Sequence, residues 1–98
     1  MTANGLIDLT LKEIARDYQP GTLPWMKVNS PEEWRRMLIL EQRINGMALE
    51  GNLDSLRGAL EEYQGLILGI VKEFRSLKEK KGHEMFNFVE SHAQTGER

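Results

Sequence analysis

The fold of this chain is decided by residues 53–77, which read LDSLRGALEEYQGLILGIVKEFRSL. Apolar residues recur there at alternating intervals of three and four, which is the heptad spacing of a helix that buries one side. Only a continuous helix places all of them on the same side. We therefore expect a central helix from Leu53 to about Lys81, ended by Gly82. Its apolar seam consists of Leu53, Leu56, Leu60, Tyr63, Ile67, Ile70, Phe74 and Leu77.

A second helix is predicted before the central one, and its start is the clearest in the sequence. Ser30 suits the N-cap, and Glu33, three residues later, completes a capping box. Pro31 suits the first helical position, where its missing N–H costs nothing. We expect this helix to run to about Glu50. Its inner stripe consists of Trp34, Met37, Leu38, Ile44, Met47 and Ala48.

Gly51 and Asn52 separate the two helices. Gly51 suits the left-handed residue that follows a helix end, and Asn52 suits the N-cap of the next helix. Because a two-residue link makes neighbouring helices antiparallel, we expect a helical hairpin of about 31–50 and 53–81. Asn45-Gly46 is a competing break, but the apolar spacing continues past it.

Glu41 interrupts the apolar stripe of the second helix. It either pairs with a buried arginine or lies at the edge of the stripe, and we favour the second interpretation. No other residue invites comparison with an enzyme site: a pocket would have to be assembled from residues such as Glu41, Tyr63 and Arg75, which the sequence does not single out.

A short amphipathic helix is predicted over residues 6–18, with Thr10 as an alternative start because a capping box begins there. Pro20-Gly21 ends it. Residues 19–29 are predicted to form a loop, because Pro20 and Pro24 oppose helix formation. The loop is too apolar to be a free linker, so we expect it to lie on the helices. Its apolar residues are Leu23, Trp25, Met26 and Val28.

The remaining residues complete one small domain over 1–98, since 98 residues leave no room for two. Residues 83–94 are predicted to form one more short helix after Gly82. We expect residues 1–5 and 94–98 to be disordered.

The two long helices are unequal, at roughly 30 Å and 43 Å, so the central helix should overhang by roughly 13 Å. Phe74 and Leu77 lie on that overhang, and burying each is worth about 1.5–3 kcal/mol. The run Leu66–Val71 covers every side of the helix, so we expect it to be buried nearly all round. One facing helix cannot supply that cover. The cover must come from the first helix, the loop with Trp25, the C-terminal segment or a second copy of the chain. We favour several of these, including a homodimer that completes a helical bundle.

Glycines form a smooth strip on the side of the central helix away from the seam. Each costs up to about 1 kcal/mol relative to alanine. Either a second helix crosses closely here or these are unoptimised surface positions, and the two interpretations are near even. Gly65 and Gly69 are better candidates for a crossing than Gly58, because they flank or interrupt the apolar run. The predicted interaction surface is therefore Gly65, Gly69, Phe74 and Leu77.

Composition narrows the classes of function. The net charge of -2 gives no global attraction to nucleic acid or anionic membrane. The sequence has no cysteine, so disulfides, thiolate metal sites and a cysteine nucleophile are excluded, which fits a cytoplasmic location. The N-terminus does not resemble a signal peptide, and no apolar run approaches the ~20 residues of a membrane span.

No catalytic or metal-binding pattern is present. His83 and His92 are nine residues apart, whereas one helical face requires a spacing of three, four, seven or eight. Glu61 and Glu62 are adjacent and point in different directions, so they do not form an acid/base pair. We expect no cofactor, no metal and no enzymatic activity.

Two features keep a nucleic-acid function open. The end of the central helix is basic, although a solvated, dipole-matched helix end explains this more simply. Residues 9–18 resemble the opening helix of a helix-turn-helix unit, which implies a second, recognition helix within about four residues. Pro24 lies where that helix should begin. The basic residues are Lys72, Arg75, Lys78, Lys80 and Lys81.

The sequence therefore predicts an all-α domain: a hairpin flanked by short N-terminal and C-terminal helices and completed as a bundle by dimerisation. Its expected function is that of a non-enzymatic protein-interaction or assembly module, with a second copy or another helical protein as the partner and no membrane. A small nucleic-acid-associated regulatory protein is the alternative.

Overall fold

The computed structural model describes the backbone of residues 2–95 and the side chains of residues 2–79. Within residues 2–95 it is all-helical, with no strand, and the helices pack as a small bundle, which confirms the predicted fold class. The chain is elongated: its radius of gyration is 19.0 Å, compared with ~13 Å for a compact chain of this length. The helices are α1 (Ala3–Asp17), α2 (Thr22–Asn29), α3 (Pro31–Glu50) and α4 (Leu53–Thr95).

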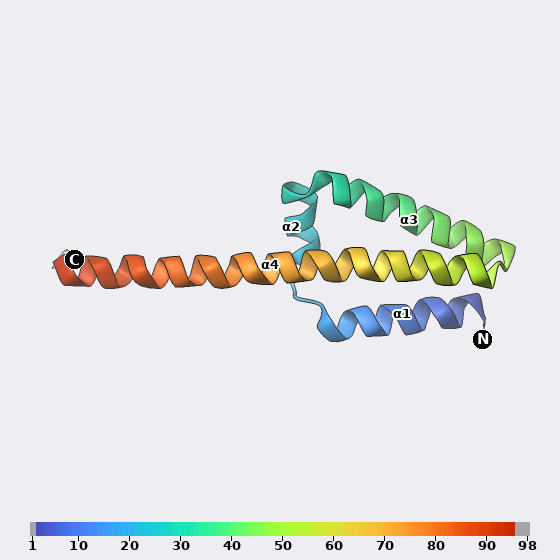
Figure 1. Cartoon of the computed structure of the whole chain (residues 1–98), viewed down its shortest axis with the longest axis horizontal. Coiled ribbons are helices and arrows are strands. Elements are labelled where there is room, and N and C mark those ends of the chain that lie inside the picture. Colours follow the sequence, from blue (N-terminus) through green and yellow to red (C-terminus); the bar gives the residue numbers. More distant parts are fainter. Residues whose placement is uncertain (1, 96–98) are drawn as a thin grey trace.

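The axis of the molecule is α4. Both α1 and α3 pack against it, α2 bridges α3 and α4, and direct contact between α1 and α3 is slight within the described residues. In Figure 1, α1 and α3 flank the first half of α4, while the second half extends beyond them. No helix in the described part of the chain is both long enough and apolar enough to cross a membrane.

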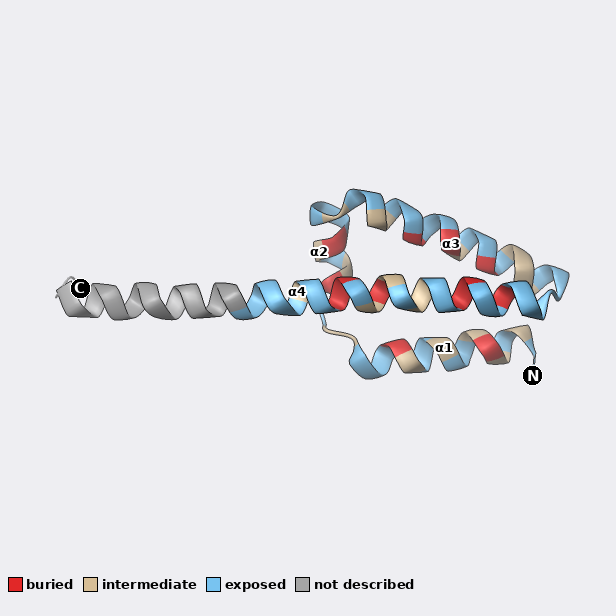
Figure 2. Ribbon diagram, in the orientation of Figure 1, coloured by how far each residue is buried: buried red, intermediate tan, exposed pale blue. Residues whose placement is uncertain are grey.

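The seam of α4 is buried in its middle and exposed at its ends. Leu56, Leu60 and Ile67 are buried, whereas Leu53 is 36% exposed and Leu77 is 43% exposed. Figure 2 shows the buried positions along the part of α4 that the other helices flank. The three-and-four spacing therefore identified the correct side of the helix, and the positions of α1, α2 and α3 decide how much of that side is covered.

The predicted end of the central helix is wrong. The backbone stays helical through Gly82 to Thr95, so residues 83–94 continue α4 instead of forming a separate helix. A single glycine costs a helix only about 1 kcal/mol, and the lysines and glutamates around it are good helix formers. Of the predicted disordered ends, residues 94–95 are helical, while residues 96–98 lie outside the described residues.

The start of α3 differs in detail from the prediction. Pro31 occupies the first turn as expected, but the Ser30 side chain makes no capping hydrogen bond. Its backbone serves both neighbouring helices instead, because the Ser30 N–H donates to Met26 at 2.8 Å and the Ser30 carbonyl accepts from Trp34 at 2.9 Å. With α2 ending where α3 begins, Ser30 joins two helices and does not follow a loop.

The turn between α3 and α4 agrees with the prediction. Gly51 adopts the left-handed conformation, with φ 73°, and the Asn52 N–H donates to the Met47 carbonyl at 3.1 Å. The Asn52 side chain then accepts from the Ser55 N–H at 3.2 Å, as an N-cap does. The chain reverses here, and α4 runs back beside α3 (Figure 1).

The inner stripe of α3 needs one correction. Leu40 is buried together with Met37 and Ile44, while Leu38 is 41% exposed. Residues 37, 40 and 44 share one side of a helix, whereas residue 38 is turned by about 100° from residue 37. Leu38 therefore belongs to the flank of α3 and not to its core side.

The N-terminal helix starts earlier than predicted. It begins at Ala3, where the Thr2 hydroxyl accepts from the Gly5 N–H at 3.0 Å, and not at residue 6 or at Thr10. Residues 3–5 are therefore helical, while Met1 lies outside the described residues. The earlier start lets α1 bury Leu6 against α4.

The predicted loop over residues 19–29 is also wrong, because residues 22–29 form α2. Pro24 is the third residue of this helix, where the backbone N–H has no intrahelical partner and its absence costs little. Met26 is fully buried, as expected of a segment that lies on the other helices, but Val28 is 77% exposed. Pro24 was thus mistaken for a helix breaker, whereas Pro20 lies between α1 and α2, as predicted.

The core consists of two clusters along α4. One joins the end of α1, α2 and the start of α3 to α4 around Met26 and Ile70. The other joins the start of α1 and the end of α3 to α4 around Leu56. Tyr63 packs against both clusters. The run Leu66–Val71 is only partly enclosed, contrary to expectation, because Gly69 is exposed.

Candidate interaction surface

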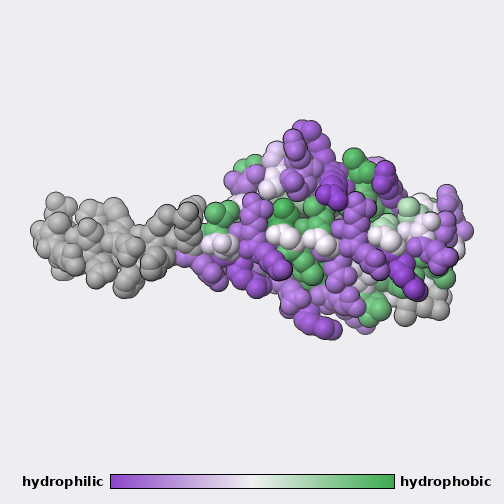
Figure 3. Space-filling model, in the orientation of Figure 1, coloured by the Kyte–Doolittle hydropathy of each residue, from purple (hydrophilic) through white to green (hydrophobic). Residues whose placement is uncertain are grey.

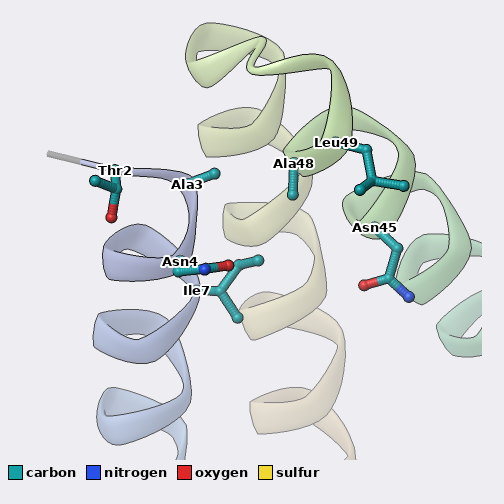
Figure 4. Close-up of a pocket in the computed structure, with 7 residues that line it drawn as sticks. All are labelled: Thr2, Ala3, Asn4, Ile7, Asn45, Ala48 and Leu49. Carbon is teal, nitrogen blue, oxygen red and sulfur yellow. The ribbon is translucent and has the colours of Figure 1, made fainter.

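A groove runs between α1 and α3 on top of α4. Its wider part has a volume of about 730 Å³ and lies between the N-terminal turns of α1 and the last turns of α3. Figure 4 shows the side chains of α1 and α3 on its two sides, with α4 behind them. The groove arises because α1 and α3 both pack on α4 but barely on each other. The lining residues are Thr2, Ala3, Asn4, Ile7, Asn45, Ala48 and Leu49.

A second cavity of about 270 Å³ continues the groove toward α2. Leu11 of α1 and Asn45 of α3 line its sides, and Leu60 and Tyr63 of α4 line its floor. Asn45 and Ile7 line both cavities, so the two form one continuous surface. Most of this lining is apolar, which favours a partner that buries carbon surface over a charged ligand.

One polar pair lies in the groove. The Tyr63 hydroxyl donates to the Glu41 Oε2 at 3.0 Å. Burial raises the pKa of Tyr63 to about 12, with further contributions from this hydrogen bond and from the negative charge of Glu41. Glu41 is half-buried. No described arginine pairs with it, and it accepts a hydrogen bond from the Tyr63 hydroxyl, a partner that neither sequence interpretation foresaw.

The outer flank of α3 carries large apolar side chains in water. Leu49 is 90% exposed, Ile39 is 52% exposed, and Leu38 is exposed as well. Isolated exposed leucines are normal on protein surfaces, but Leu38 and Leu49 share one side of α3, and Leu49 lines the groove. Sequence reasoning missed Leu49 and assigned Leu38 to the core, because polar residues separate them and mask their spacing.

The predicted surface on α4 is divided between two sides of that helix. Phe74 is covered within the chain: its ring lies 5.6 Å from that of Trp25, centroid to centroid, and it faces Gly21. Leu77 stays partly exposed. Gly65 and Gly69 are exposed on another side. The structure therefore does not bring the four residues together.

The glycine strip is open in this chain. At Gly58, Gly65 and Gly69, an added Cβ would meet no atom within 4 Å. Figure 3 shows a row of near-neutral residues along α4 with hydrophobic patches beside it. No described helix of the same chain crosses the strip, so a close crossing at Gly65 and Gly69 stays a prediction about a second molecule.

The basic residues lie on the solvent side of α4 where the structure describes them. Lys72, Arg75 and Lys78 are exposed. Arg75 Nη2 donates to the Asp17 carbonyl at 3.2 Å, so this cation sits at the C-terminal end of α1, where the helix dipole favours it. The side chains of Lys80 and Lys81, and those of His83 and His92, lie outside the described residues.

The described side chains include no candidate metal site. Among residues 2–79, no group of three or more His, Cys, Asp or Glu is placed to hold a metal ion. Glu62 pairs with Arg36 at 3.0 Å on the surface, an exposed ion pair of the kind that contributes little to stability. Comparison with protein families, curated proteins and solved structures found no match to this chain.

Proposed function

We propose that this chain is a non-enzymatic helical assembly module that completes its bundle with a second copy of itself. The groove between α1 and α3 carries this proposal. Three helices that meet around a groove occupy three corners of a four-helix bundle, and the fourth corner is open. A helix from a partner is the element whose shape and apolar stripe fit such a position.

Self-association also follows from the size of the chain. A domain of 98 residues buries only about 60–65% of its unfolded surface, so a monomer with exposed leucines has little stability to spare. In this proposal α3 and α4 act as an antiparallel hairpin, and two such hairpins form the dimer. We propose a cytoplasmic location, since a chain without cysteine needs no oxidising compartment.

The first prediction concerns the mass in solution. Sedimentation equilibrium and light scattering should give twice the 11.3 kDa of one chain at micromolar concentration. The melting temperature should rise with protein concentration, because association stabilises the folded state by mass action. A well-folded monomer whose melting temperature does not depend on concentration would contradict the assembly role.

The alternative function, nucleic-acid association, gains support from α2. This helix begins within four residues of the end of α1, as the resemblance of residues 9–18 to a helix-turn-helix unit requires. Lys27 is its only basic residue, and the cation lies 5.9 Å above the Trp34 ring. A mobility shift on mixed DNA or RNA that weakens steeply with salt would support this alternative. An absence of binding at low salt would exclude it.

A further inference from the structure

A second seam with heptad spacing, made of two leucines and two amides, runs along the flank of α3 at the edge of the groove. Leu38, Gln42, Asn45 and Leu49 follow one another at intervals of four, three and four. This is the heptad spacing of a helix that pairs with another helix. All four residues are exposed, and Leu49 is the most exposed large apolar residue in the described part of the chain. The seam therefore lacks the partner that its spacing predicts.

The order of residues in this seam is the same in either direction: leucine, amide, amide, leucine. When two copies of α3 pair antiparallel, Leu38 of one faces Leu49 of the other at both ends. Between them, Gln42 faces Asn45 twice, and the amide groups can donate and accept hydrogen bonds. A second copy of α3 that runs in the opposite direction therefore matches this seam at each of its four layers.

The charges at the two ends select the antiparallel direction. Arg35 lies one turn before Leu38, and Glu50 directly follows Leu49. Both are exposed, and neither belongs to an ion pair within residues 2–79. Antiparallel copies place Arg35 beside Glu50 of the second copy at each end, whereas parallel copies place like charges together. Antiparallel helix dipoles favour the same direction.

We propose that α3 of a second copy pairs antiparallel with α3 at the edge of the groove, through Leu38, Gln42, Asn45 and Leu49. This proposal rests on the assembly role and names the helix, the direction and the register. Because the pair is two-fold symmetric, the seam of each α3 covers the seam of the other.

The decisive variant is Leu49→Glu, measured by sedimentation equilibrium. Burying an unpaired carboxylate twice at the interface should weaken the dimer at least about tenfold. Because Leu49 is exposed in the single chain, the circular dichroism of the monomer should not change. Val28→Glu is the matched control: it places the same charge at an exposed apolar position on α2, away from the seam, and the dimer should persist.

A charge exchange tests the same interface without changing its apolar layers. Arg35→Glu should weaken the dimer, and Arg35→Glu combined with Glu50→Arg should restore it. If the double variant dimerises no more tightly than Arg35→Glu alone, the antiparallel pairing is overturned. The charge exchange also tests the antiparallel pairing if Leu49→Glu lowers the helix content.

Disulfide trapping tests the register, and the absence of cysteine makes every trapped bond interpretable. A mixture of Leu38→Cys and Leu49→Cys chains should cross-link, whereas each variant alone should not. In the antiparallel pair the two copies of residue 38 are about 16 Å apart along the helix, beyond the reach of a disulfide. Cross-linking of Leu38→Cys alone would show a parallel pair and overturn the proposal.

The outcomes separate this inference from the assembly role. A wild-type dimer that Leu49→Glu leaves intact would overturn the α3 pairing and leave the assembly role standing, with the glycine strip of α4 as the next surface to test. A wild-type monomer at all concentrations would overturn both. A wild-type monomer that binds a foreign amphipathic helix through Leu49 would replace the second copy as the occupant.

Discussion

Tyr63 is the residue at which the two halves of the core meet. It packs against both hydrophobic clusters and carries a hydroxyl into the groove, where the hydroxyl donates a hydrogen bond to Glu41. A half-buried phenol beside a carboxylate holds its proton more tightly than a phenol in water, because ionisation would place two negative charges together. The residue thereby joins α3 to α4 and remains neutral over the physiological range.

The stability of the fold should consequently depend on Tyr63 at alkaline pH. The pKa is about 12 in the folded chain and 10.0 without perturbation, so the folded state holds the proton more tightly. The contribution is fully present below pH 10.0 and is lost as the pH rises through about 12. Denaturant unfolding of the wild type and Tyr63→Phe across this window should show a steeper alkaline decline in the wild type.

Glu41→Gln provides the second variant for this experiment. Removing the carboxylate charge lowers the pKa of Tyr63 toward 10.0, so the alkaline loss of stability should shrink. Tyrosinate absorbance measures the pKa directly, and the Tyr63→Phe protein gives the contribution of Tyr18. An unchanged tyrosinate titration in Glu41→Gln would contradict the contact between Tyr63 and Glu41.

Substitution of two glycines by alanine should change the stability in opposite directions, because their backbone geometries differ. Gly65→Ala should raise stability by up to about 1 kcal/mol, because the helix gains propensity and the new Cβ meets no atom within 4 Å. Gly51→Ala should lower it by about 1 kcal/mol, because alanine is strained at φ 73°. Urea unfolding of a dissociated variant such as Leu49→Glu measures both. Weaker association of Gly65→Ala would indicate a second chain on the strip.

At the scale of elements, α2 supplies cover that the sequence assigned to several sources, among them the Trp25 loop and a second copy of the chain. Its eight residues fill the space between the start of α3 and α4. Trp25 covers Phe74, and Met26 closes the cluster around Ile70. Phe74, which was assigned to the overhang, is therefore covered by a segment whose Pro24 argued against a helix, while the overhang itself is longer than predicted because α4 runs to Thr95.

The contact between Trp25 and Phe74 can be measured with a double-mutant cycle. The rings are tilted by 49° with centroids 5.6 Å apart, a favourable aromatic arrangement. Trp25→Ala and Phe74→Ala should each destabilise the chain, and the coupling between them should be about 0.5–1.5 kcal/mol. Additive effects of the two substitutions would show that α2 does not pack on α4 through these rings.

At the scale of the whole molecule, three helices surround α4 incompletely. Both α1 and α3 pack against the apolar seam of α4, and the groove between them leaves apolar side chains exposed to water. A monomer leaves this surface in water, whereas the proposed dimer would bury the exposed flank of α3. If association buries this surface, the melting temperature should rise with protein concentration, as predicted above.

The sequence alone determined the elements whose signals are local. The turn at Gly51-Asn52 followed from the need for a left-handed residue and a side-chain cap, and both are present. The seam of α4 followed from its spacing, since helical geometry fixes which residues share a side. Even so, the predictions at Gly82 and Pro24 were wrong. Each residue destabilises a helix, but a helix still forms where the interactions of its other residues outweigh that free-energy cost.

Only the tertiary structure decided which of these surfaces meet. Leu38 and Leu40 have the same chemistry and lie two residues apart, yet one is exposed and the other buried, according to where α4 crosses α3. Glu41 gained its partner from a residue 22 positions away, and the groove exists because α1 and α3 occupy separate sides of one helix. Spacing fixes the side of a helix, whereas burial depends on the positions of the other helices.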